Sequence, residues 1–112
     1  MHSMPLALAL HWRPMPEQGD DPVVRELRDA IDAADRDVLA ALNRRIDAVR
    51  RLHDHKTANG YSLSDPSREA AIVASLQDAN DGPMADESVP DVVAAVLALT
   101  LGEVRRLRGQ GW

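Results

Sequence analysis

The sequence predicts an all-α protein whose subunit has three helices, one long, one short and one of medium length, and which forms a helical homodimer. Helix-forming residues dominate its 112 positions, and only 3% of them are aromatic, which favours helices over a sheet. Apolar residues recur at steps of three and four in three segments. The first of these segments is too long for one small subunit to cover, which is the observation that predicts the dimer.

The long helix is predicted from Asp21 to about Ala58. Asp21-Pro22 is a typical helix start, and Asn59-Gly60 is a typical helix end. One face of the helix carries Val24, Leu27, Ile31, Ala34, Val38, Ala41 or Leu42, Val49 and Leu52. Arg45 interrupts this apolar face where the pattern calls for a hydrophobic residue.

The length of this helix predicts the assembly. About 37 residues at about 1.5 Å each extend about 55 Å, whereas a globule of this chain length has a radius of gyration of about 13 Å. The apolar face of such a helix would stay in water along much of its length in a single subunit. We therefore expect a second chain to lie against it, most simply with twofold symmetry.

Two further helices follow. Asp65 as N-cap and Pro66 at the first helical position predict the short helix, which ends at the Asn80-Asp81-Gly82-Pro83 run. The medium helix is expected to begin at Asp86-Glu87-Ser88. Its predicted inward residues are Val89, Val92, Val93, Val96, Leu99 or Thr100, Val104 and Leu107.

The domain boundaries follow from these helices. Residues 1–20 hold three prolines and a glycine without a sustained period and are expected to form a flexible leader. The helical domain spans residues 21–108, and residues 109–112 are expected to form a loose tail.

Composition excludes several functions. The net charge of −5 argues against general nucleic-acid binding. Without cysteine the chain has no disulfide and no thiolate metal site, which fits a cytoplasmic protein. The apolar run at residues 5–10 is too short to span a membrane.

Three basic residues predict an anion site. Arg45 and Lys56 are about 20° apart around the helix axis and about 16 Å apart along it, so their side chains can converge on one small molecule. Arg28 lies about 25 Å from Arg45 along the same helix, but an antiparallel partner helix would bring its own Arg28 back toward Arg45. The alternative is that these residues are ordinary solvated helix charges.

Metal and nucleophile chemistry are not expected. His53 and His55 flank Asp54, but a step of two residues turns them about 200° apart on a helix, so they do not form a chelating pair. No arrangement of Ser, His and Asp indicates an activated nucleophile. We expect no cofactor.

The segments LRDAIDAADRDVLAALNRR and SLSDPSREAAI, with Lys56 between them, resemble the all-helical chorismate mutase family. The similarity covers about Val24 to about Leu107. It implies an intertwined dimer in which the first helix crosses to the partner. It implies that Arg28 reaches into the other subunit's site, whereas Arg45 and Lys56 act in their own.

The resemblance also implies roles in substrate binding. Asp65 and Arg68 would shape the start of the second helix near the ligand, and Glu69 would accept a hydrogen bond from the ring hydroxyl of the substrate. The third helix departs from the family, which commonly has a serine and, one turn later, a glutamine or glutamate. Those positions fall at Thr100 and Val104, or, with the register shifted by one, at Leu99 and Glu103.

The implied activity is the pericyclic rearrangement of chorismate to prephenate in aromatic amino-acid or related biosynthesis, which needs a grip on a dianion rather than a nucleophile, metal or cofactor. Two alternatives stay open. One is the same reaction on 4-amino-4-deoxychorismate, and the other is a weakly active interaction module that needs a shikimate-pathway synthase as partner. A pyruvate-lyase reaction on isochorismate is a further alternative.

Overall fold

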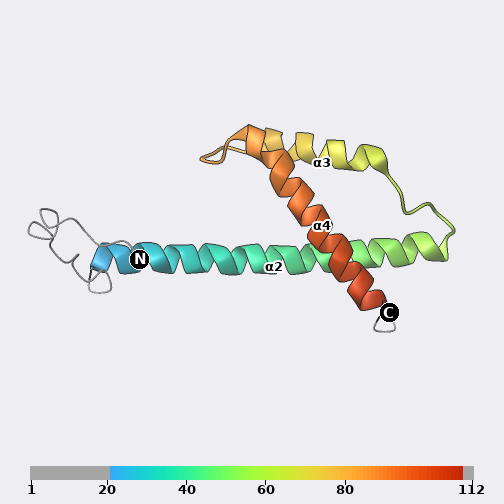
Figure 1. Cartoon of the computed structure of the whole chain (residues 1–112), viewed down its shortest axis with the longest axis horizontal. Coiled ribbons are helices and arrows are strands. Elements are labelled where there is room, and N and C mark those ends of the chain that lie inside the picture. Colours follow the sequence, from blue (N-terminus) through green and yellow to red (C-terminus); the bar gives the residue numbers. More distant parts are fainter. Residues whose placement is uncertain (1–20, 110–112) are drawn as a thin grey trace, which may run out of the picture. The chain divides into compact units, whose positions relative to one another are not determined.

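The structure is a computed structural model that describes residues 21–109, and all of its regular elements are helical (Figure 1). They are α2 (Pro22–Ala58), α3 (Pro66–Ala79), the 3-10 helix η2 (Asp86–Ser88) and α4 (Val89–Arg108). No strand occurs between residues 21 and 109, so the predicted all-α class with long, short and medium helices is confirmed. The expectations for residues 1–20 and 110–112 lie outside the described residues.

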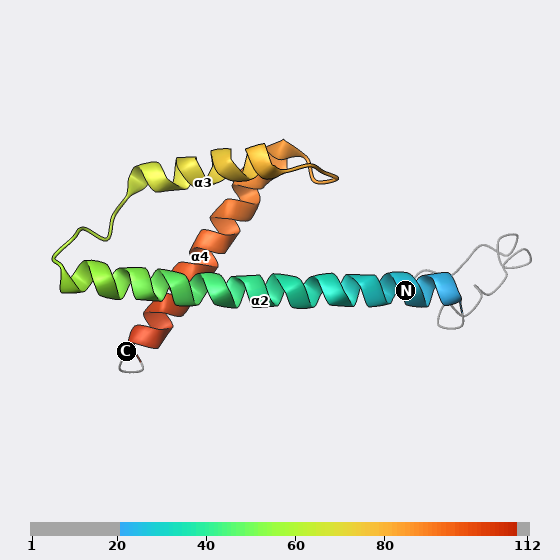
Figure 2. The ribbon, with the colours of Figure 1, turned by 180° about the vertical axis from the view of Figure 1, so that it is seen from behind.

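The chain divides into two compact units, Met1–Arg36 and Asp37–Trp112, and α2 contributes to both. Within the second unit, α3 packs on α4. A hydrogen bond between Arg45 of α2 and Thr100 joins α4 to the C-terminal part of α2, and Figure 2 shows α4 returning from the end of α3 toward that part. The site described below lies entirely in this unit.

Helix α2 starts and stops where the sequence predicts. The Oδ1 atom of Asp21 accepts a hydrogen bond from the backbone N–H of Val23 at 2.8 Å, which satisfies one of the free donors of the first turn. At the other end Gly60 has a φ of 67°, and the N–H of Tyr61 donates to the carbonyl of Lys56 at 2.8 Å. This pairing closes the helix on a left-handed glycine.

Helix α3 begins at Pro66, with Asp65 in the N-cap position as predicted. The Asp65 side chain makes no capping bond to the helix amides; it accepts a hydrogen bond from the Ser67 hydroxyl at 2.9 Å. The loop after α3 is held by Asn80, whose Nδ2 donates to the Met84 carbonyl at 2.8 Å and to Asp86 Oδ1 at 2.7 Å. Gly82 in that loop has a φ of 83°.

Helix α4 supplies the buried core of the described chain. Its buried residues lie on one face at steps of four, seven and four, and they are Val89, Val93, Thr100 and Val104. Of the open pair Leu99 or Thr100, the structure buries Thr100. Two details of the prediction are wrong. Val92, predicted to face inward, is 41% exposed. Asp86–Ser88 forms its own 3-10 turn, and α4 starts after it at Val89.

Helix α2 has no buried residue. Large apolar side chains on it, among them Leu27, Ile31 and Val38, are each more than half exposed. Between residues 21 and 109, no helix combines the length and the apolar content that crossing a membrane requires.

Candidate active site

A cavity of about 620 Å³ lies in the second unit, within the size range usual for small-molecule sites. Helix α2, the segment that leads into α3, α3 itself and one residue of α4 surround it. It is lined by Arg45, Ala48, Val49, Leu52, His53, Lys56, Leu63, Asp65, Arg68, Ile72 and Leu97. The cavity therefore combines apolar walls with a small set of charged groups.

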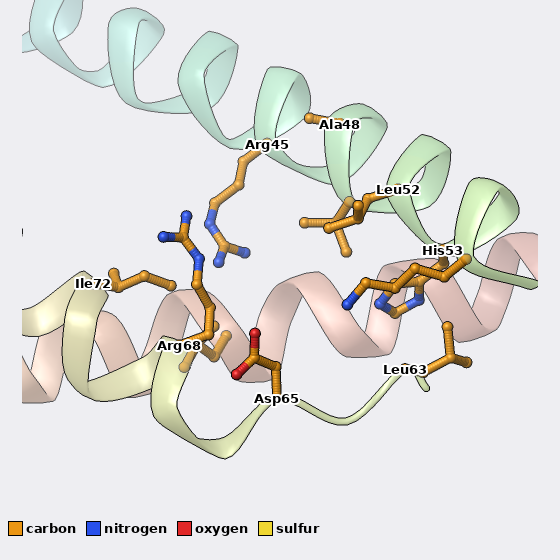
Figure 3. Close-up of a pocket in the computed structure, with 11 residues that line it drawn as sticks. Arg45, Ala48, Leu52, His53, Leu63, Asp65, Arg68 and Ile72 are labelled. Atoms are coloured by element: carbon orange, nitrogen blue, oxygen red, sulfur yellow. The ribbon is translucent and has the colours of Figure 1, made fainter. Parts of the chain in front are cut away.

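Three cations converge on this cavity. Arg45, Leu52 and Lys56 share one face of α2 because they follow each other at helical spacing. Arg68 comes from the first turn of α3, and Figure 3 shows its side chain and that of Arg45 extending toward each other from the two helices. The structure thus brings together Arg45, Lys56, Asp65 and Arg68, four of the residues predicted for the site.

The charges of the site are unbalanced. Among residues 21–109, none of the three cations Arg45, Lys56 and Arg68 is ion-paired with a carboxylate. Within the described part of the chain, Asp65 is the one acidic residue that lines the cavity. Bringing like charges together in a partly apolar cavity costs free energy unless an anion joins them. The arrangement is that of a binding site for a small dianion, since paired guanidinium donors fit carboxylates.

Thr100 lies directly behind Arg45. It is 3% exposed, and its hydroxyl donates to the carbonyl of Val96 on the same helix at 2.7 Å. The same oxygen accepts a hydrogen bond from Nη1 of Arg45. Thr100 does not line the cavity, so in this structure it positions Arg45 from α4.

Substitution of Thr100 tests this link. Thr100→Val keeps the shape but removes the acceptor for Arg45, and we expect kcat/KM for the reaction proposed below to fall by about tenfold, the usual consequence of losing a hydrogen bond to a charged group. Thr100→Ser keeps the hydroxyl and is expected to stay within about twofold of wild type. Equal activity of the Val and Ser variants would contradict a positioning role.

The structure does not bring every predicted residue to the cavity. Glu69 is exposed and Val104 is 2% exposed in the core, and neither lines the cavity. Glu103, the alternative in the shifted register, is paired with Arg106 at 2.7 Å. Arg28 belongs to the other unit, and its role in a partner's site stays a prediction.

His53 is a lining residue that sequence reasoning missed. From the sequence, His53 is considered only together with His55, as a possible metal-binding pair. The spacing of three residues between His53 and Lys56 could have indicated its place in the site, because it puts the side chains of His53 and Lys56 on one face of α2. Burial lowers the pKa of His53, as do the charges of Arg108 and Lys56, against an opposing contribution from Asp54.

A second cavity of about 290 Å³ shares Arg45, Arg68 and Ile72 with the first. Its remaining lining is aliphatic and consists of Leu76, Val92, Val93 and Val96. The two arginines therefore stand between an apolar cavity and a charged one.

Comparison with known proteins decides which family this geometry represents. The family model described as chorismate mutase type II matches residues 27–103, which is most of the chain and includes the whole of the charged cavity. The chain belongs to this family. The resemblance expected from its motifs is thereby confirmed.

Individual proteins that are similar to this chain also carry chorismate mutase in their names. A bifunctional chorismate mutase/prephenate dehydratase from Neisseria gonorrhoeae is 34% identical over 80 residues, which are 71% of this chain but 22% of that protein. The chain thus spans about a fifth of the length of this relative. Two structures of chorismate mutase from Thermus thermophilus, Form I and Form II, are 27% and 28% identical to it with TM-scores of 0.65 and 0.68. They cover 69% and 74% of this chain, which in turn covers 96% and 94% of theirs.

Proposed function

We propose that this protein is a chorismate mutase, which converts chorismate into prephenate. The observation that carries the proposal is the convergence of Arg45, Lys56 and Arg68, without a carboxylate partner among residues 21–109, on one cavity of a family member. The substrate is a dianion, and its two carboxylates fit two guanidinium groups. In the reaction one ether C–O bond breaks and one C–C bond forms within a single molecule, so no other reactant is required.

The charged residues of the cavity bind the substrate and stabilise its transition state, and the apolar residues shape the cavity. Arg45 and Arg68 hold the carboxylates and select the folded conformer in which the two reacting carbons are close together. Lys56 offers a point charge to the ether oxygen, where negative charge develops as the C–O bond lengthens. The apolar walls, Leu52 and Ile72 among them, exclude water and strengthen these interactions. Glu69 accepts a hydrogen bond from the ring hydroxyl in this proposal.

A homodimer belongs to the same proposal. The exposed apolar side chains of α2 support it, because a second copy would cover them. The intertwined arrangement lets Arg28 of one chain enter the site of the other, which would add a further cation to the grip on the dianion. The protein would act in the cytoplasm, in aromatic amino-acid or related biosynthesis.

A turnover assay tests the activity. Purified protein should consume chorismate and accumulate prephenate in equal amounts, measured by the loss of chorismate absorbance and by chromatography of the product. The expected rate is far above that of the uncatalysed rearrangement, because the three cations act mainly on the transition state. The proposal would be refuted if chorismate reacted no faster than the uncatalysed rate in the presence of well-folded protein, both alone and with a synthase partner.

Two variants of the proposal share this site. The side chain of Val104 has no hydrogen-bond donor, and this lack at the third-helix position motivates a changed substrate in the first variant and dependence on a partner in the second. The changed substrate is tested by measuring kcat/KM side by side on chorismate and 4-amino-4-deoxychorismate, since the larger value identifies the substrate.

Dependence on a partner is tested by adding a shikimate-pathway synthase. A rise in turnover and co-elution of the two proteins are expected only for a partner-dependent enzyme.

A further inference from the structure

His53 lies in the charged cavity together with the three cations that the proposed function uses. It projects from α2 one helical turn before Lys56, and Figure 3 shows its ring on the same side of the view as Leu63, away from Arg45 and Arg68. His55, two residues further on, does not line the cavity, and its ring packs edge-on against Tyr61 instead. Of the two neighbouring histidines, the structure therefore selects one for contact with a ligand.

We propose that His53 is a substrate-binding residue whose imidazole lies against the bound dianion and takes up a proton as the dianion enters the cavity. This inference rests on the proposed function. It adds an imidazole to a site whose other cations are arginines and a lysine. The affinity for the dianion should then depend on pH through a single side chain.

The charges around His53 give the direction of this dependence. On its own helix Lys56 and Arg45 share the cavity and Asp54 is adjacent in sequence, α4 contributes Arg108, and Asp65 and Arg68 line the cavity from the α3 side. Burial, Arg108 and Lys56 lower the pKa of His53 below its ordinary value of 6.5, so the imidazole is mainly neutral at pH 7 while the site is empty.

A bound dianion shifts the pKa of His53 in the opposite direction, upward. Two carboxylates among the cations offset the repulsion from Arg108 and Lys56 and so raise the pKa of His53. By linkage, the dianion binds more tightly as the pH falls through the pKa of the complex, and the gain levels off below the pKa of the empty site. The carboxylates of the substrate keep their charge throughout, since such groups ordinarily titrate below about pH 4.

The test compares KM for chorismate from pH 8 to pH 5.5 in wild type, His53→Gln and His55→Gln. In wild type and His55→Gln we expect KM to fall by about fivefold over this range, the upper end for a partly exposed charge pair, with a smaller change in kcat. In His53→Gln we expect KM to change little. His55→Gln is the matched control, because it removes a histidine from the same helix outside the cavity.

Proton uptake gives a second measurement that needs no turnover. Calorimetric titration of wild type with prephenate at pH 6.5, in buffers of different ionisation enthalpy, should show net proton uptake on binding, and His53→Gln should show less. The same KM profile in His53→Gln as in wild type, or equal uptake in both, would overturn the role of His53 while leaving the mutase activity intact. Absence of both turnover and prephenate binding would overturn the proposed function and this inference together.

Discussion

Arg45→Ala is expected to lower kcat/KM for chorismate by about 10²- to 10³-fold, the loss found when one donor to a developing or bound negative charge is removed. Arg45 stands at the meeting point of the two cavities, and Thr100 holds its guanidinium from behind. Truncation removes a carboxylate grip that no neighbouring side chain on α2 can replace. The measurement is steady-state kinetics on purified protein.

Arg44→Ala is the matched control for this experiment. Arg44 precedes Arg45 on α2, is exposed, and lines neither cavity, so its removal takes away the same charge from the same helix. We expect Arg44→Ala to stay within about twofold of wild type in kcat/KM, as is usual for an exposed charge. Thermal unfolding of both variants shows whether a loss of activity comes from weaker binding of the substrate carboxylate or from unfolding of the protein. Equal activity of the two variants would remove the charged cavity from the mechanism.

Mixing two inactive variants is expected to restore activity if the site is shared between subunits. Arg28 precedes Arg45 by seventeen residues, or about 25 Å along a helix, so the two cannot hold one small ligand from the same chain. In a heterodimer of Arg28→Ala and Arg45→Ala chains, one site carries both lesions and the other carries neither. With random exchange, half of the dimers are mixed, and recovery should reach about a quarter of wild-type activity.

A second mixture controls for unspecific recovery. Arg45 and Lys56 line the same cavity of one chain, so every site in an Arg45→Ala and Lys56→Ala heterodimer carries one lesion. We expect that mixture to stay as inactive as its parents after the same exchange protocol. If the Arg28 mixture also stays inactive although subunit exchange is demonstrated by mass-tagged chains, the shared site is wrong.

The local pattern of the sequence determined the helices and most of the charged site. Asp21-Pro22 and Asn59-Gly60 marked the ends of α2 because capping and left-handed backbone depend on residues within one turn. Arg45 and Lys56 fell on one face of α2 because helical spacing alone fixes that relation. The helix-start signal at Asp65 and Pro66 placed Asp65 and Arg68 at the start of α3. The resemblance to the chorismate mutase family assigned both residues to the ligand.

The tertiary structure decided what the other helices bring to that face. Periodicity left Leu99 and Thr100 equivalent, and only the packing of α4 buried Thr100 and joined its hydroxyl to Arg45, a contact between residues far apart in sequence. Packing also brought the charge of Arg108 close enough to His53 to lower the pKa of His53. A sequence pattern records which residues share a helix face, whereas the partners of that face depend on how the helices pack.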